Sequence, residues 1–198
     1  VAMSAASYKF GGETNIKASS ASTGITFSGA NPKVDTADAN ITLTGPVVIS
    51  NGELDINSAG GNIEITGNIT SAGVDEALTL DDGTGTGTIT LGGTVTSGDI
   101  TLIGDSGISI AGDITSNKDG AAGAIAFTGP VTLTGNVIVT ADDHADSTIT
   151  FNSTSTVNAS TSGGQSLTLD TDAGAIAMQG AIGGSTALSA LTVNADGA

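Results

Sequence analysis

A short motif recurs along the chain and constrains the fold more than any other feature. It consists of Ile, any residue, a large apolar residue, any residue, Gly, any residue, and then Val or Ile. Six copies, ITLTGPV, IEITGNI, ITLGGTV, ISIAGDI, IAFTGPV and IAMQGAI, begin at Ile41, Ile63, Ile89, Ile108, Ile125 and Ile176. Imperfect copies begin at Ile25 and Ile149. The copies start 16 to 27 residues apart, a period typical of solenoid proteins.

A second apolar motif alternates with the first. It reads LDIN, LTLD, ITLI, VIVT, LTLD and LTVN, and the copies begin at Leu54, Leu78, Ile100, Val137, Leu167 and Leu191. This second motif is missing between Ile108 and Ile125, which is one of the two shortest intervals. The motifs keep their internal spacing while the segments between them vary, as expected when a solenoid accepts insertions in its loops.

The spacing inside each motif is that of a short β-strand. Alternate strand residues point to opposite faces, so Ile41 and Leu43 face inward while Thr42 faces outward. The Gly at the fifth position permits a bend that a β-carbon would obstruct. One coil cannot bury its apolar stripe alone, but stacked coils can. We therefore predict an all-β fold, a parallel β-solenoid (β-helix) of about eight coils of roughly 22 residues.

The Ile motifs are expected to stack as one core ladder, with like residues about 4.8 Å apart in successive coils. In this scheme Phe27, Phe127 and Phe151 take the same inward position as Leu43 and Leu91. The predicted ladder consists of Ile41, Leu43, Ile63, Ile65, Ile89, Leu91, Ile108, Ile110, Ile125, Phe127, Ile149, Phe151, Ile176 and Met178. A β-sandwich is the structural alternative; it explains alternating strands but not the fixed offset between the motifs.

The two ends of the sequence lead to separate expectations. We predict that residues 1–24 form an N-terminal segment, either the lead-in to the solenoid or a contact between subunits, and that residues 25–198 form the solenoid. The sequence finishes in LTVNADGA, which reads as the opening of a coil without a cap. An uncapped coil exposes a sheet edge that can pair with another chain. We therefore expect end-to-end stacking into a filament.

Three longer blocks resemble the repeats of large secreted bacterial surface proteins of the filamentous-haemagglutinin type. They read ITLTGPV, LTLDTDAGAIAMQGAIGG and ALSALTVNADGA, and the resemblance covers nearly the whole chain from Ile25. It implies a right-handed parallel β-helix, export to the cell surface, and a role in adhesion or in building an extracellular fibre. The partner of such an adhesin would be a host or surface glycan or protein.

The charge balance excludes two classes of partner. The chain has 20 acidic residues against 4 basic ones, for a formal net charge of −16, and it contains no arginine. A nucleic-acid binder needs a cationic surface to release counterions from phosphate, so nucleic acid is not expected as a partner. Anionic membrane surfaces would repel the chain, and no apolar run approaches the roughly 20 residues that span a bilayer, so membrane insertion is not expected.

The densest acidic cluster surrounds the single histidine, His144. Its carboxylates are Asp142, Asp143 and Asp146, and hard cations such as calcium bind several such oxygen ligands. These three aspartates are therefore candidate calcium ligands, and no other cofactor is expected. The competing interpretation is a solvated loop between two strands, because the chain has neither an EF-hand loop nor a calcium-roll repeat.

Two other functions that solenoid folds can carry compete with a structural role. A carbohydrate-active enzyme needs paired carboxylates, usually beside aromatic platforms, but this chain has no Trp and one Tyr, and we predict no catalytic residue. Ice binding needs outward Thr pairs in register, and among the outward pairs of the Ile motifs only Thr42 and Thr44 are both Thr. We therefore expect an extracellular structural or adhesive module at the cell surface rather than an enzyme.

Overall fold

The computed structural model describes residues 1–18, 24–73, 76–118, 121–142, 144–171 and 173–195. Within these ranges the chain forms 24 short β-strands and no helix. The strands pair in parallel and assemble into three sheets, which we call A, B and C. The chain contributes strands to A, B and C in turn seven times, and its last three described strands lie in A, B and A.

The strands of each sheet follow one another in chain order. Sheet A contains β1 (Ala2–Met3), β4 (Ile25–Phe27), β7 (Val47–Ile49), β10 (Ile69–Ser71), β13 (Val95–Ser97), β16 (Ile114–Ser116), β19 (Val137–Thr140), β22 (Ser166–Asp170) and β24 (Ala190–Asn194). Sheet B contains β2 (Ser7–Phe10), β5 (Lys33–Thr36), β8 (Leu54–Asn57), β11 (Leu78–Asp81), β14 (Ile100–Ile103), β17 (Ala124–Thr128), β20 (Thr148–Phe151) and β23 (Ala175–Met178). Sheet C contains β3 (Thr14–Lys17), β6 (Ile41–Thr44), β9 (Ile63–Ile65), β12 (Ile89–Leu91), β15 (Ile108–Ile110), β18 (Val131–Leu133) and β21 (Val157–Ala159).

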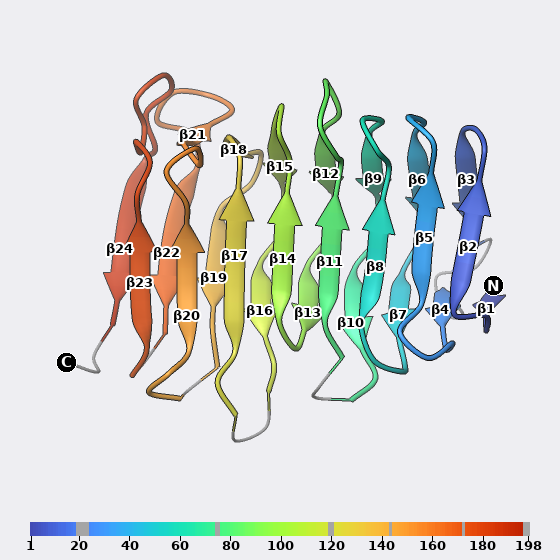
Figure 1. The fold of residues 1–198 in the computed structure, drawn as a ribbon. Helices are drawn as coiled ribbons and strands as arrows, with labels where there is room; N and C mark the ends of the chain where they lie inside the picture. Colours follow the sequence, from blue (N-terminus) through green and yellow to red (C-terminus); the bar gives the residue numbers. More distant parts are fainter. Residues whose placement is uncertain (19–23, 74–75, 119–120, 143, 172, 196–198) are drawn as a thin grey trace.

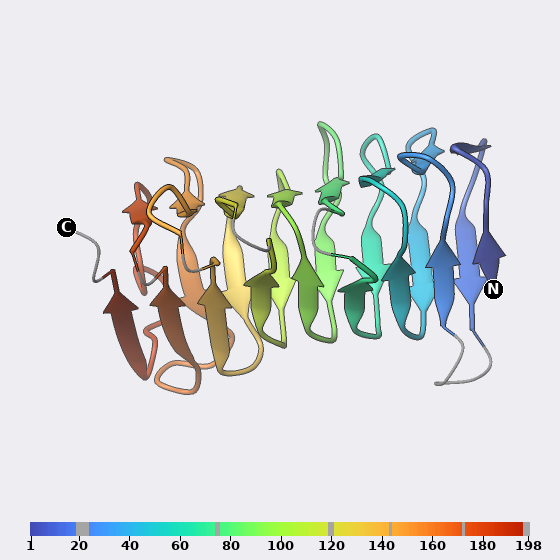
Figure 2. The same ribbon diagram turned by 90° about the horizontal axis from the view of Figure 1, so that it is seen from below.

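The chain winds as a right-handed coil (Figure 1). In this view it ascends the front in sheet B, crosses the top in sheet C and descends the back in sheet A, while the coils advance from the N-terminus at the right to the C-terminus at the left. Figure 2 shows the coils side by side from below. Leu54 pairs with Leu78, one coil and 24 residues further on. The predicted parallel β-solenoid is confirmed, with about eight turns roughly 24 residues apart.

The core is a column of aliphatic side chains enclosed by the three sheets. Strand residues alternate between buried and exposed positions, as in β14, where Ile100 and Leu102 are fully buried and Thr101 and Ile103 are half-buried on the outer face. Phe127 and Phe151 stack inside sheet B with ring centroids 4.4 Å apart and an interplanar angle of 6°. Stacking equivalent residues of successive coils thus buries an apolar stripe that one coil alone would leave exposed.

The prediction of one ladder running through all Ile motifs is wrong, because part-way along the chain the Ile motif moves from sheet C to sheet B and the second motif moves from sheet B to sheet A. The copies at Ile41, Ile63, Ile89 and Ile108 stack in sheet C. The copy at Ile125 instead pairs with the second motif at Ile100, and the remaining ladder residues follow it in sheet B, namely Phe127, Ile149, Phe151, Ile176 and Met178. Phe27 lies in sheet A, so it does not share a position with Leu43.

This shift of both motifs to another sheet occurs where the second motif is missing from the sequence. After β15 the chain enters β16 in sheet A and then reaches sheet B with Ile125 itself, so the Ile motif takes the place of the second motif. Both motifs present alternating apolar residues, and either can therefore fill an inner face. The ladder residues are buried, except that Ile176 and Met178, in the last strand of sheet B, are only partly buried against the core.

Residues 2–17 already belong to the solenoid. The strands β1, β2 and β3 pair in parallel with β4, β5 and β6, one in each sheet. The structure therefore extends the coils to Ala2, where the sequence pattern alone placed an N-terminal segment before the first recognisable motif.

In the copies of the Ile motif that stack in sheet C, the repeated glycine lies at the turn from sheet C to sheet A, where successive coils are in close contact. A β-carbon on Gly112 would lie 2.7 Å from the carbonyl carbon of Gly93 in the preceding coil. The same clash, with the backbone of Gly67, would follow from a side chain on Gly93. Glycine is required here by the close approach of two backbones, in addition to any bend that it permits.

Candidate functional site

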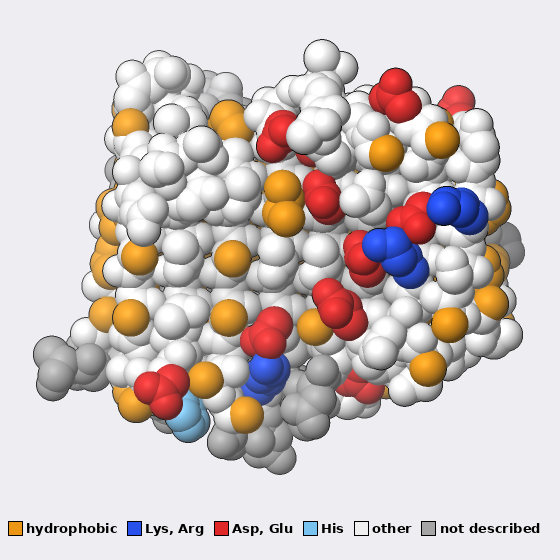
Figure 3. Space-filling view, in the orientation of Figure 1, with side chains coloured by type: hydrophobic (Ala, Val, Ile, Leu, Met, Phe, Trp, Pro, Cys, Tyr) orange, Lys and Arg blue, Asp and Glu red, His pale blue; other side chains and the backbone are white. Residues whose placement is uncertain are grey.

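The outer face of sheet B carries charge on one half only. In Figure 3 the charged side chains gather over the coils nearer the N-terminus, and few lie over the coils nearer the C-terminus. The charged half includes Lys33, Asp35, Glu53, Asp55 and Asp81, which occupy outward positions on or beside β5, β8 and β11, and Lys9 on β2, which pairs with Asp35. The other half presents alanine and threonine, as where Ala126 pairs with Thr150 and Thr150 with Ala177.

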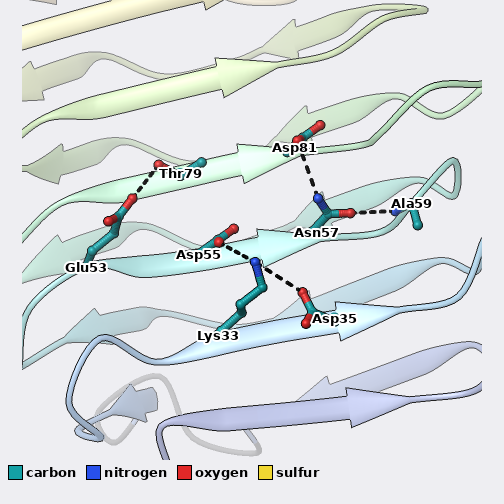
Figure 4. Close-up of polar contacts among 8 residues, drawn as sticks. All are labelled: Lys33, Asp35, Glu53, Asp55, Asn57, Ala59, Thr79 and Asp81. Atoms are coloured by element: carbon teal, nitrogen blue, oxygen red, sulfur yellow. Dashed lines mark hydrogen bonds and ion pairs between the residues drawn. The ribbon is translucent and has the colours of Figure 1, made fainter.

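Lys33 is the centre of the charged half. Its Nζ lies 2.7 Å from a carboxylate oxygen of Asp55 in the next coil and 3.6 Å from Asp35 on the same strand. The hydrogen bond to Asp55 raises the pKa of Lys33 above its ordinary 10.5, so the lysine is charged at neutral pH. The close-up in Figure 4 shows the ammonium group between the two carboxylates.

The neighbouring side chains on this face also bond from one coil to the next (Figure 4). The hydroxyl of Thr79 donates to Glu53 at 2.7 Å, and the amide of Asn57 donates to Asp81 at 3.4 Å. Each of these carboxylates thus has a partner in the adjoining coil. These bonds between adjoining coils hold the strands of sheet B in register, so the charged side chains have a structural role.

The predicted calcium ligands lie in the loop between β19 and β20. The backbone N–H of His144 donates to the carbonyl of Asp142 at 2.8 Å, and that of Asp146 donates to Nδ1 of His144 at 3.1 Å. Asp143 lies outside the described residues. Among the residues that the structure describes, no three acidic or histidine side chains gather as metal ligands would. Calcium binding here stays a prediction.

A file of threonines follows the outer face of sheet A. Four successive coils place a threonine at the same outward position, in Thr70, Thr96, Thr115 and Thr140. Thr26 continues the file on the other side of Val48. The outward pairs of the Ile motifs, by contrast, lie on three different sheets, so reading them as one face was wrong. The pairing of the strands in sheet A thus aligns a file of threonines that the spacing of the Ile motifs did not predict.

Both ends of the column leave core side chains accessible. A hollow of about 480 Å³ at the N-terminal end is lined by Val1, Met3, Phe10, Glu13, Thr14, Asn15, Ile16 and Lys17. A hollow of about 360 Å³ at the other end is lined by Ile182, Gly183, Ala187, Leu188, Ala190 and Leu191. The inward residues of the last strand of sheet A, Leu191 and Val193, are 41% and 44% exposed. The lining of the second hollow is apolar, whereas half of the residues that line the first are polar or charged. Both hollows lie at sheet edges that no further described strand pairs.

Comparison with known proteins finds no family model, no curated protein and no solved structure that matches this chain. Within the described part of the chain, no helix is long and apolar enough to cross a membrane. The functional assignment therefore depends on the geometry of the solenoid and on its surfaces.

Proposed function

We propose that this chain is an extracellular structural or adhesive solenoid module, part of a surface fibre or giant adhesin, and that its coils stack end to end with those of a second copy. The observation that carries the proposal is the exposed core at the last described strand of sheet A, where Leu191 and Val193 face the column axis and are 41% and 44% exposed. The resemblance of the repeats to those of surface adhesins supports the cellular location.

Two features support head-to-tail stacking over pairing of like ends. Parallel sheets offer the same strand direction at both ends, so the first coil of one copy can continue the sheets of another. The first coil also bears Lys9 and Lys17, whereas residues 119–198 contain no lysine. Pairing two N-terminal ends would bring these lysines together, so like-charge repulsion disfavours that arrangement. A head-to-tail contact does not close on itself and produces a filament.

Electron microscopy across a concentration series tests the stacking. We expect thin filaments of uniform width from the wild-type chain and their loss in the double variant Leu191→Lys, Val193→Lys, which places charge in the contact. Ile138→Lys is the matched control, since Ile138 is 45% exposed on the side of the rod. Isolated short rods at every concentration, or filaments that persist in the double variant, would exclude this mode of stacking.

Adhesion is tested separately, by screening the purified chain against glycans, surface proteins and cells. We expect retention on a glycan or protein ligand.

Repeating the screens and the microscopy with calcium and with a chelator examines Asp142, Asp143 and Asp146: calcium-dependent stability or binding would support the predicted ligands. Identical behaviour in both conditions would identify this loop as a solvated turn.

Ice binding is the second candidate, because the threonine file on sheet A repeats at the strand spacing of about 4.8 Å. The file is one residue wide: the positions two residues before its threonines read Asn68, Thr94, Asp113 and Ile138. An ice-recrystallisation assay compares the wild-type chain with Thr96→Lys, Thr115→Lys. Inhibition by the wild type that the variant loses would favour ice binding, and absence of inhibition would exclude it.

A further inference from the structure

The corner between sheets B and C is lined on the inside by a file of polar residues. Thr36, Ser58 and Asp82 each follow the last outward residue of a sheet B strand, in β5, β8 and β11. The backbone ladder continues through this corner, since the N–H of Ser58 donates to the carbonyl of Asp81 at 3.1 Å. All three side chains are buried. They therefore occupy equivalent places in three successive coils.

The first two members of the file act as hydrogen-bond donors. The Thr36 hydroxyl donates to the carbonyl of Ala39 at 2.6 Å and to that of Ser58, in the next coil, at 3.2 Å. The Ser58 hydroxyl likewise donates to the carbonyl of Gly61 and to that of Asp82 at 3.3 Å. The position thus places a donor between the carbonyl three residues on and the carbonyl of the next coil.

Asp82 occupies the third place with a carboxyl group and has no exposed surface. Its Oδ1 accepts the backbone N–H of Asp105 at 3.1 Å, while its Oδ2 has no hydrogen-bond partner among the described residues. An ionised carboxylate only accepts hydrogen bonds, whereas a protonated carboxyl group also donates one. A buried charged oxygen without a partner is costly, so the surroundings favour the protonated form.

The charged groups around Asp82 also favour its protonated form. Asp81 on β11 and Asp105 on the loop after β14 are the charged groups next to it, and the preceding coil contributes the uncharged Ser58. Burial, together with these two carboxylates, raises the pKa of Asp82 from 3.8 to about 6, although the hydrogen bond from Asp105 opposes the shift.

We propose that Asp82 acts as a clamp that is stronger in acid. Its protonated carboxyl group donates a hydrogen bond at the position where Thr36 and Ser58 donate theirs, and it thereby stabilises the corner between β11 and β12. Ionisation of Asp82 removes this donor and destabilises the corner. The solenoid is then most stable in a mildly acidic medium. Because the proton is bound more tightly by the folded chain, this contribution is fully present below pH 3.8 and is lost as the pH rises through about 6.

Thermal and urea unfolding between pH 3.5 and pH 8 test the clamp, with Asp82→Asn as the neutral mimic. At pH 7.5 we expect the variant to unfold less readily, with an equilibrium constant on the order of 100-fold smaller than that of the wild type, because the shift is about two pKa units. The difference should vanish near pH 3.5. The control Glu64→Gln removes an exposed carboxylate from the outer face of β9 and should keep the wild-type pH profile.

A carbon-13 NMR titration of the Asp82 carboxyl group in the wild-type chain reports the proton directly, whether or not the variant folds. A midpoint near 6 supports the clamp. A midpoint near 3.8, or the same pH profile for Asp82→Asn and the wild type, would overturn it. Asp82→Ser provides a further comparison, since it restores the hydroxyl donor of the file and should also abolish the pH dependence.

Discussion

At the scale of single residues, Gly112 illustrates how a missing side chain sets the distance between coils. The carbonyl carbon of Gly93 lies 2.7 Å from where its β-carbon would be, and Thr94 N lies 2.9 Å from the same point. Backbone atoms held in a parallel ladder cannot shift as the end of a flexible side chain can. The repeated glycine of the motif is thus a packing requirement that the spacing of the motif alone does not reveal.

We predict that Gly112→Ala lowers the free energy of unfolding by about 1–3 kcal/mol, the cost of overpacking a well-packed site. Gly12→Ala is the matched control, because a β-carbon there would meet no atom within 4 Å, and its effect should stay within about 0.5 kcal/mol. Urea unfolding followed by circular dichroism measures both variants. Equal losses would show that the coils are not in close contact at Gly112.

At the scale of elements, each strand has one face in the core and one in water. In β14, Leu102 pairs with Leu80 and Phe127 on the inner face, and Ile103 pairs with Asp81 and Thr128 on the outer face. The two residues are neighbours of similar size, and only the pleat separates their environments.

We predict that Leu102→Ala costs about 2–5 kcal/mol, since it removes buried methyl groups and leaves a cavity. Ile103→Ala should cost less than about 1 kcal/mol, because its side chain is half-exposed already. Chemical denaturation of the two variants under the same conditions compares them. A larger loss for Ile103→Ala would reverse the assigned faces of sheet B.

At the scale of the whole molecule, stability is distributed along a one-dimensional stack. A central strand such as β13 is bonded to β10 on one side and β16 on the other, whereas among the described strands β24 is bonded to β22 alone. In such a stack each coil is stabilised by its neighbours, so the end coils open most easily.

We predict that amide hydrogens of β13 and β14 exchange through global unfolding, while those of β24 exchange about 100-fold faster or more, through local opening. Hydrogen exchange measured by NMR on a dilute sample resolves the two classes. Raising the concentration should then protect β24 together with the strands of the first coil, because head-to-tail stacking places these two ends in contact. Uniform exchange along the rod at low concentration would show that the end coils are as stable as the central coils, and it would contradict this prediction.

The amino-acid sequence by itself determined the repeat, the alternation within each strand and hence the parallel β-solenoid with its aliphatic core, because side-chain direction in a strand is a local property. Only the tertiary structure decided which strands are neighbours. Ile125 stacks on Ile100 rather than on Ile108. The inner faces of the three sheets accept the same residues, so the lengths of the loops determine which sheet a strand joins. The threonine file and the burial of Asp82 follow from that register, which is why no local pattern could predict them.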